Sequence, residues 1–269
     1  MSAPDLTFSE DQIQRYARHI LLPEVGGTGQ ARLLNSKVLV IGAGGLGSPL
    51  VTYLAAAGVG TIGVVDDDRV EASNLQRQIL HGTADLGRPK VDSAADRVAA
   101  LNKDVTLIRH PLRLSADTAE ALIAPYDVIA DGSDNFATRF LVNDACHFLG
   151  KTLVSAAVLR FDGQISTFKT HSGGPCYRCL YREPPPPGTT ASCAEAGVLG
   201  AVTGLLGSYQ AVEVMKELLG IGTSLSGRLQ IFDCLSATSR EVRLKPDPNC
   251  PLCSAEATIT GLTADGALP

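Results

Sequence analysis

Residues 37–51, KVLVIGAGGLGSPLV, combine an apolar β-branched run, a glycine-rich turn and the start of a helix. Gly42, Gly44 and Gly47 fit the spacing G-x-G-x-x-G. In this arrangement glycines allow a tight turn and close backbone approach to a phosphate, which the helix N-terminus then faces. The turn predicts a nucleotide site without saying which nucleotide. The alternative is a turn that only packs the helix on the strand.

The same alternation of strands and helices continues along the chain and predicts an α/β fold. We expect strands within 61–66, 104–110, 126–134 and 151–158, and helices within 48–59, 90–101, 115–124 and 135–150. Such alternation is typical of a Rossmann-like, doubly wound, mainly parallel sheet with ligands at the carboxyl ends of its strands. Upstream, residues 8–22 are expected to form a helix capped by Ser9, followed by a second short helix.

After about residue 160 the pattern changes to an antiparallel extension. We expect a strand at 162–169, a long helix within 196–220 and a hairpin from 227–233 and 239–245. The segment EPPPPG is expected to be an exposed loop, because proline runs exclude regular structure. We predict one continuous fold over 1–253, with halves at about 1–160 and 161–253, and a flexible tail at 254–269.

Composition narrows the classes of function. The 269 residues are 45% hydrophobic, which suffices for a sizeable core. The net charge is −5 and the pI about 5.5, so no nucleic-acid partner is expected. No apolar run reaches the roughly 18 residues that a membrane span needs, and the N-terminus lacks a signal pattern. A cytoplasmic protein without a membrane partner is therefore expected.

Polar residues after the glycine turn favour a triphosphate over a redox dinucleotide. Asp66 ends the next strand, where a carboxylate can accept hydrogen bonds from ribose hydroxyls. Asn74, Gln76 and Arg77 follow in DDRVEASNLQRQIL, and Lys90 lies in GRPK at a helix start. Hydride transfer does not require several cations beside the phosphates. Release of pyrophosphate does, because negative charge builds on the leaving group.

A second acidic group follows a later strand, in DGSDNFATR. Asp131, Asp134 and Asn135 are expected at the same edge of the sheet. A carboxylate there can hold Mg²⁺ together with phosphates. Asp134 as a helix N-cap is the alternative, and the two roles are compatible.

Four of the seven cysteines form two C-x-x-C pairs, Cys176/Cys179 and Cys250/Cys253. Each pair can offer two thiolates to one ion, and four thiolates suit Zn²⁺. A redox dithiol is the alternative. Cys146 and Cys234 lie in apolar segments and are expected to be core residues.

Eight motifs in order resemble the MoeB/ThiF/HesA family, bacterial relatives of ubiquitin-activating enzymes. They are RYARHILL, GxGGLGSP, DxDxVExSNLQRQ, GxPKV, DGSDNFxTR, GGPCYRCL, CAEAGVLG and CPLC. The resemblance covers nearly the whole chain to Cys253 and is strongest to MoeB-type members. It implies ATP-dependent adenylation of the C-terminal Gly-Gly carboxylate of a ubiquitin-like sulfur carrier, most directly the small subunit of molybdopterin synthase in molybdenum cofactor synthesis.

The resemblance also implies roles for individual residues. The glycine turn would carry the phosphates, Asp66 the ribose, and Asp134 a Mg²⁺ ion. Arg18 would reach into the partner subunit's site of a homodimer, and the four paired cysteines would hold a structural Zn²⁺. The full implied nucleotide set is Gly42, Gly44, Gly45, Gly47, Asp66, Asp68, Ser73, Asn74, Leu75, Gln76, Arg77, Lys90, Asp134 and Asn135. Because a carboxylate is already ionised at neutral pH, the reaction needs no catalytic base.

Cys193 matches the position of the ubiquitin-activating thiol. It is either a sulfur-relay or carrier-contact cysteine, with a pKa lowered at a helix N-terminus, or a passive residue. Residues 182–192 are expected to cross the carrier's tail. Since the chain ends sixteen residues after Cys253, we expect a separate sulfur donor, a rhodanese or a cysteine desulfurase. Other possible functions are adenylation of a ThiS-like carrier for thiamine and a threonylcarbamoyl-adenosine dehydratase-like activity on tRNA, against which the four-cysteine set counts.

Overall fold

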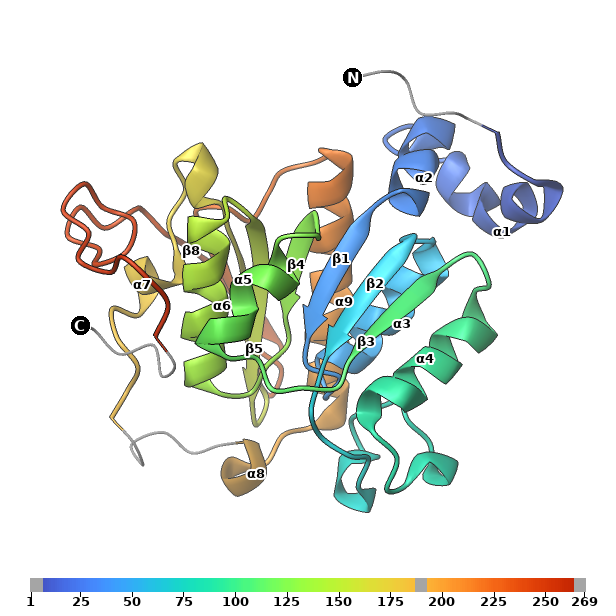
Figure 1. The fold of residues 1–269 in the computed structure, drawn as a ribbon, viewed down its shortest axis with the longest axis horizontal. Coiled ribbons are helices and arrows are strands. Elements are labelled where there is room, and N and C mark those ends of the chain that lie inside the picture. The colour runs from blue at the N-terminus through green and yellow to red at the C-terminus, as the bar shows by residue number, and fades with distance from the viewer. Residues whose placement is uncertain (1–6, 187–192, 264–269) are drawn as a thin grey trace.

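The computed structural model describes residues 7–186 and 193–263, and an eight-stranded sheet runs through its middle (Figure 1). The strand order is β3-β2-β1-β4-β5-β6-β7-β8. The strands are β1 (Lys37–Ile41), β2 (Thr61–Val65), β3 (Thr106–His110), β4 (Val128–Asp131), β5 (Thr152–Leu159), β6 (Asp162–Phe168), β7 (Arg228–Asp233) and β8 (Thr238–Arg243). The strands from β1 to β5 are parallel, and β6, β7 and β8 extend the sheet antiparallel. The predicted fold class is confirmed.

The helices are α1 (Glu10–Ile20), α2 (Gly26–Leu34), α3 (Gly47–Ala57), α4 (Lys90–Leu101), α5 (Ala116–Ile123), α6 (Phe136–Phe148), α7 (Tyr177–Leu180), α8 (Cys193–Ala196) and α9 (Gly200–Leu219). Short 3₁₀ turns lie at Ala72–Asn74, Thr83–Asp85 and Thr170–Ser172. No helix in the described part of the chain is long and apolar enough to cross a membrane.

Helices cover both faces of the sheet and enclose two cores. In β1, Val38 and Val40 face one core and Leu39 and Ile41 the other, because successive side chains of a strand alternate. The first core is closed by α3, α4 and α9, and the second by α5 and α6, which lie in front of the sheet in Figure 1. Strands buried on both faces read as continuous apolar runs, which is why the sequence predicts them well.

Helix α9 joins the two parts of the sheet. It packs on β4 and β5 of the parallel part, on β6 of the antiparallel part, and on α3. Gln210, at the middle of α9, donates side-chain hydrogen bonds to the carbonyls of Asp131 and Val154. These bonds tie the helix to the carboxyl end of β4 and to β5.

The first two helices lie beyond the amino end of β1, at the upper right of Figure 1. Ser9 caps α1 in a reciprocal pair with Gln12, as the sequence predicts. The buried Tyr16 accepts a hydrogen bond from Asn102 at the end of α4 and lies against Gly58 at the end of α3. Helix α1 is therefore fixed to the C-terminal ends of α3 and α4.

Two sequence expectations differ from the structure. The long helix begins only at Gly200, because Arg160 of the β5–β6 turn hydrogen-bonds to Gly197 and Leu199 and holds the intervening residues extended. The tail expected from residue 254 is also wrong at Ile259, which is 5% exposed and packs against Cys176, Cys250 and Leu252. Of the expected loop at 182–192, residues 187–192 lie outside the described part of the chain.

Candidate functional site

The glycine turn joins β1 to α3 with backbone packed on backbone. Gly42 has φ +91°, a conformation that favours glycine. A Cβ at Gly47, the first residue of α3, would lie 1.9 Å from the carbonyl oxygen of Gly42. The turn thus leaves no room for a side chain at Gly47, and it brings the N-terminus of α3 to the carboxyl edge of the sheet. That geometry suits an anion.

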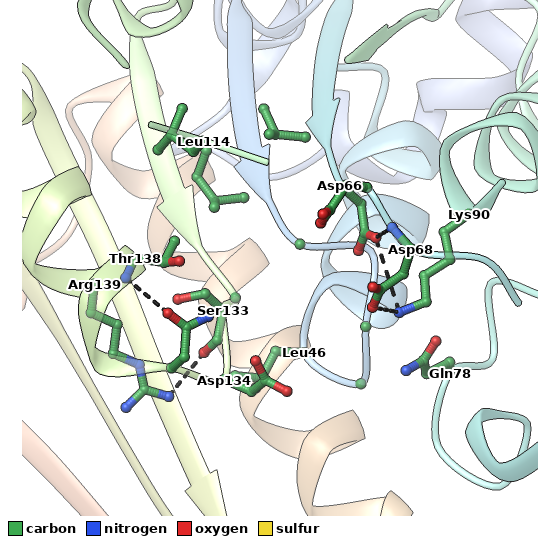
Figure 2. Close-up of a pocket in the computed structure, with 18 of the residues that line it drawn as sticks. Leu46, Asp66, Asp68, Gln78, Lys90, Leu114, Ser133, Asp134, Thr138 and Arg139 are labelled. Atoms are coloured by element: carbon green, nitrogen blue, oxygen red, sulfur yellow. Dashed lines mark hydrogen bonds and ion pairs between the residues drawn. The ribbon is translucent and has the colours of Figure 1, made fainter. Parts of the chain in front are cut away.

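An open cavity of about 250 Å³ lies over this turn. Of the residues expected to bind nucleotide, Gly42, Gly44, Gly45, Asp66, Asp68, Arg77, Lys90, Asp134 and Asn135 line it. They come from the ends of β1, β2 and β4 and from the starts of α4 and α6, except Arg77, which lies in the connection between β2 and α4. Figure 2 shows Lys90 and Asp134 on opposite sides of the glycine turn.

Asp66 is held in place by the backbone. Its Oδ2 accepts a hydrogen bond from the Ala43 N–H at 2.8 Å, and its Oδ1 accepts one from the Asp68 N–H at 2.9 Å. Burial raises the pKa of Asp66, and the positive charge of Lys90 partly opposes that rise. Each carboxylate oxygen keeps a second lone pair, so the oriented group can still accept bonds from a ligand hydroxyl.

Lys90 is a buried cation at the first position of α4. Its Nζ lies 2.7 Å from Asp68 Oδ2 and 4.0 Å from Asp66 Oδ1. The side chain is 6% exposed, while that of Asp68 is 67% exposed. The ammonium is therefore held at the cavity wall by a carboxylate on its solvent side.

Buried polar groups lie in the walls of the cavity and directly behind them. His81 lies between the Ala43 carbonyl and the Ser93 hydroxyl, each at 2.9 Å, and burial lowers its pKa. Within the described residues, Gln78 Oε1 and Ser133 Oγ have no hydrogen-bond partner. Both residues line the cavity, and such orphaned atoms fit a polar ligand.

The opposite wall is built by the turn between β4 and α6. Asn135, not Asp134, caps α6, since Asn135 Oδ1 accepts the Thr138 N–H at 2.9 Å. The alternative role of Asp134 as the N-cap is therefore wrong, and its exposed carboxylate is left facing the cavity (Figure 2). Asp131 is fully buried instead, accepting from the Ser133 N–H and the Ser155 hydroxyl.

Several predicted residues do not line this cavity. They are Arg18, Gly47, Ser73, Asn74, Leu75 and Gln76. Asn74 Oδ1 caps its own turn by accepting the Glu71 N–H, and Gln76 lies against Gly200 at the start of α9. The carbonyl of Ser73 accepts a hydrogen bond from Arg77 at 3.0 Å, so Ser73 supports a residue that does line the cavity.

Two predicted site residues, Arg18 and Cys193, belong neither to the implied nucleotide set nor to the paired cysteines. Arg18 is exposed on α1, which packs at the C-terminal ends of α3 and α4, whereas the cavity lies at their N-terminal ends. Arg18 is thus remote from the cavity of its own chain. Cys193 begins the four-residue helix α8 rather than the long α9, and its side chain lies outside the described atoms.

Sequence reasoning missed other residues of the wall. They are Asp67, Gln78, Arg113, Ser133, Thr138, Arg139 and Thr203, with apolar contributions from Ile41, Val65, Leu112 and Leu114. Ser133, Thr138 and Arg139 lie in the motif DGSDNFATR, so a signal was present for them. Arg113 and Thr203 lie outside all eight family motifs and carried no such signal.

The four paired cysteines converge in space. All four sulfurs lie within 4.8 Å of one another, with Sγ–Sγ distances of 3.5 Å for Cys176–Cys250 and 3.4 Å for Cys179–Cys253. A tetrahedral site with Zn–S bonds of about 2.3 Å has sulfur–sulfur edges of about 3.8 Å. The thiols are free rather than paired in disulfides, so the donor set fits zinc.

A buried ion pair attaches this cysteine cluster to α6. Arg178, between the first two cysteines, makes two hydrogen bonds to Asp144 Oδ2 and Oδ1 from Nη2 and Nε, at 2.6 and 2.9 Å. The Tyr177 N–H also donates to Asn143 Oδ1 at 2.7 Å. Both acceptors lie on α6, whose first turn forms a wall of the cavity.

The sequence matches the ThiF family over residues 16–252. It is 49% identical to the sulfur carrier protein adenylyltransferase of Thermus thermophilus, covering 94% of this chain and 95% of that protein. It is 51% identical to the mouse adenylyltransferase and sulfurtransferase MOCS3, covering 97% of this chain and 56% of that protein. The chain thus spans about half the length of the MOCS3 relatives.

Solved structures support the fold. Escherichia coli MccB has a TM-score of 0.80 at 19% identity, covering 93% of this chain and 75% of that one. PaaA has a TM-score of 0.75 at 22% identity, covering 91% and 76%. The family model matches most of the chain, and the chain covers a relative at 49% identity almost completely, so the chain belongs to the ThiF family.

Proposed function

We propose that this protein is an adenylyltransferase that uses ATP to activate the C-terminal carboxylate of a ubiquitin-like sulfur carrier. One observation carries the proposal: a single cavity brings the glycine turn together with Arg77, Lys90 and the exposed Asp134. Two cations beside a phosphate-binding turn suit the release of pyrophosphate. The names of the Thermus thermophilus and mouse relatives support the same activity.

In the proposed complex, ATP lies with its base against the apolar end of the cavity and its phosphates over the glycine turn. Asp66 accepts the ribose hydroxyls, while Arg77 and Lys90 neutralise the triphosphate. Asp134, with Asn135 beside it, would hold Mg²⁺, which supplies charge neutralisation of the phosphates when bound. The chain's own contribution is alignment and electrostatics, which these residues can supply without a catalytic base.

The reaction is a displacement at the α-phosphorus. One oxygen of the carrier's carboxylate forms a bond to that phosphorus, the bond to the bridging oxygen of the β-phosphate breaks, and pyrophosphate leaves with the electron pair. The product is an acyl-adenylate. Cationic groups near the leaving group stabilise the charge that develops there.

The preferred carrier is MoaD-like, the small subunit of molybdopterin synthase, and a ThiS-like carrier is the second candidate. Sulfur would come from a separate donor protein. We also propose that the four paired cysteines bind Zn²⁺ as a structural site, because all four positions are filled by protein thiols.

We further propose a homodimer in which Arg18 acts in the partner's site. Arg18 is remote from its own cavity, and the region around it exposes Ile13, Leu21 and Leu22 by 51, 70 and 48%. Such an apolar surface favours a protein contact. In the test, the Arg18→Ala protein and the Lys90→Met protein are each expected to be inactive alone. Mixing the two variants and reassembling them as mixed dimers is expected to restore part of the activity. Absence of recovery in reassembled mixed dimers would count against a trans role.

The main test is ATP–pyrophosphate exchange with purified protein, ATP, Mg²⁺ and either a MoaD-like or a ThiS-like carrier ending in Gly-Gly. We expect exchange that requires a carrier and is lost in Arg77→Ala and Lys90→Met. Arg97→Ala, an exposed arginine on the same helix as Lys90, is the matched control and keeps full exchange. The carrier that gives the higher rate identifies the pathway. Exchange without a carrier, or none with any Gly-Gly carrier, would contradict the proposal.

Cys193 is proposed to act only after adenylation, in sulfur transfer. We expect Cys193→Ala to keep pyrophosphate exchange and to lose thiocarboxylate formation in a complete assay with a sulfur donor. Normal thiocarboxylate formation by the variant would leave Cys193 without an active role.

A further inference from the structure

Arg139, on the first turns of α6, is a buried cation to which the proposed function assigns no contact with the triphosphate. It is 9% exposed, and it lines both the nucleotide cavity and a second, much smaller cavity of about 10 Å³. Its Nη2 donates to the Ser133 carbonyl at 2.9 Å, and its guanidinium lies 5.6 Å from the centroid of the Phe136 ring. Its Nε is buried without a hydrogen-bond partner in the described chain.

Arg139 also lacks a counter-ion. Across residues 7–186 and 193–263, no carboxylate lies within 4.0 Å of its guanidinium. The buried acids of the same region are engaged elsewhere: Asp131 with Ser133 and Ser155, and Asp144 with Arg178. Because a buried, unpaired charge is strongly unfavourable, this arrangement fits a site that is completed by an anionic ligand.

The position of Arg139 separates this anion from the triphosphate. Arg77 and Lys90 come from the β2 side of the glycine turn, whereas Arg139 lies on the α6 side, beyond Ser133 (Figure 2). The second cavity continues from Arg139 along β5 and β6, where Ser155, Gln164 and Ser166 offer polar groups.

Tyr177 adds a second donor at the same place. Its hydroxyl is buried in the second cavity without a partner in the described chain. Burial raises the pKa of Tyr177 to about 12, and the charge of Arg139 partly opposes the rise. The phenol therefore stays protonated and can donate a hydrogen bond. A guanidinium without a counter-ion and a phenol without an acceptor in the described chain match a carboxylate.

We propose that Arg139 binds the carboxylate that becomes adenylated, by holding the oxygen that does not attack. This inference rests on the proposed function and assigns the acceptor end of its site. The attacking oxygen forms its bond to the α-phosphorus as pyrophosphate leaves, while the held oxygen becomes the carbonyl oxygen of the acyl-adenylate. Arg139 is paired with charge before the step and with a neutral oxygen after it, which favours release of the product.

The test compares two forms of one MoaD-like carrier, with a native C-terminal carboxylate or with a C-terminal carboxamide. Binding of each form is measured by calorimetry without ATP, so that no chemistry follows. We expect the wild type to prefer the carboxylate by roughly 10- to 100-fold, the usual effect of a charge-assisted hydrogen bond. Arg139→Met should bring the ratio close to one, and Arg139→Lys should keep part of it.

Controls separate a binding role from a structural one. Arg97→Met, at an exposed arginine, should keep the wild-type ratio, and ATP affinity should be unchanged in Arg139→Met. A folded Arg139→Met protein that keeps the full preference for carboxylate overturns this inference, even if pyrophosphate exchange has established adenylation. A wild type that prefers neither form overturns it as well. A wild type that neither binds a carrier nor catalyses exchange overturns the proposed function and this inference together.

Discussion

Adding one methyl group at Gly47 tests how tightly the glycine turn is packed. The Cβ of Gly47→Ala would lie 1.9 Å from the Gly42 carbonyl oxygen and 2.9 Å from its carbon. Real Cβ contacts essentially never fall below 3.0 Å, so the two backbones must separate by about 1.1 Å. The backbone of Gly42 is held by β1 and that of Gly47 by α3, so neither moves freely. We therefore expect a loss near the upper end of the overpacking range, about 3 kcal/mol, and a Tm lower by roughly 6–12 °C.

Gly204→Ala is the matched control. Gly204 lies inside α9, and a methyl group added there would meet no atom within 4 Å, so the same chemical change should stabilise the helix by about 0.5–1 kcal/mol. Urea denaturation gives both values, and ATP affinity reports the state of the turn. Equal midpoints for Gly47→Ala and the wild type would refute this account of the turn, because they would mean that the turn adapts at no cost.

Three further outcomes are expected. A colorimetric chelator should detect one zinc per wild-type chain and none in Cys253→Ala, whose Tm should fall, whereas full metal content in the variant would contradict a four-thiolate site. Asp144→Asn should destabilise the fold by about 3–5 kcal/mol in urea, because it removes the charge that balances the buried Arg178, while Asp96→Asn in an exposed ion pair should have little effect. Burial lowers the pKa of His81 in the folded state, so stability should fall as pH drops below about 6.5, where the unfolded chain takes up the proton first. His81→Gln should lessen that fall between about pH 7.5 and 5.5, and an unchanged pH dependence would count against this assignment.

The sequence predicts the fold well where a pattern is local. Strands buried on both faces read as apolar runs, so β1, β2 and β4 are predictable, and the cap at Ser9 follows from the residues next to it. The convergence of Cys176 and Cys250 is predictable too, because a single metal ion can take thiolate ligands from cysteine pairs that are distant in the sequence. Predictions from local sequence pattern and from ligand chemistry do not require knowledge of the tertiary structure.

Features that depend on tertiary packing were not predictable. Whether Asp134 or Asn135 caps α6 depends on the residue at which the helical backbone begins, and the two possibilities differ by one position. The burial of Ile259 depends on the cysteine cluster it covers. The isolation of Arg139 becomes visible only when the buried acids Asp131 and Asp144 are seen to have other partners, which no sequence pattern records.

The position of α9 has a consequence for the order of folding during synthesis. The cavity over the glycine turn is built mostly by residues before 160, yet one side of their core is closed by Val202, Leu206 and Val214 of α9. A chain emerging from the ribosome would carry an uncovered apolar sheet face until about residue 219 is free. The first half is then expected to need chaperone protection or rapid completion of the chain, and a fragment ending at 160 should aggregate rather than bind nucleotide.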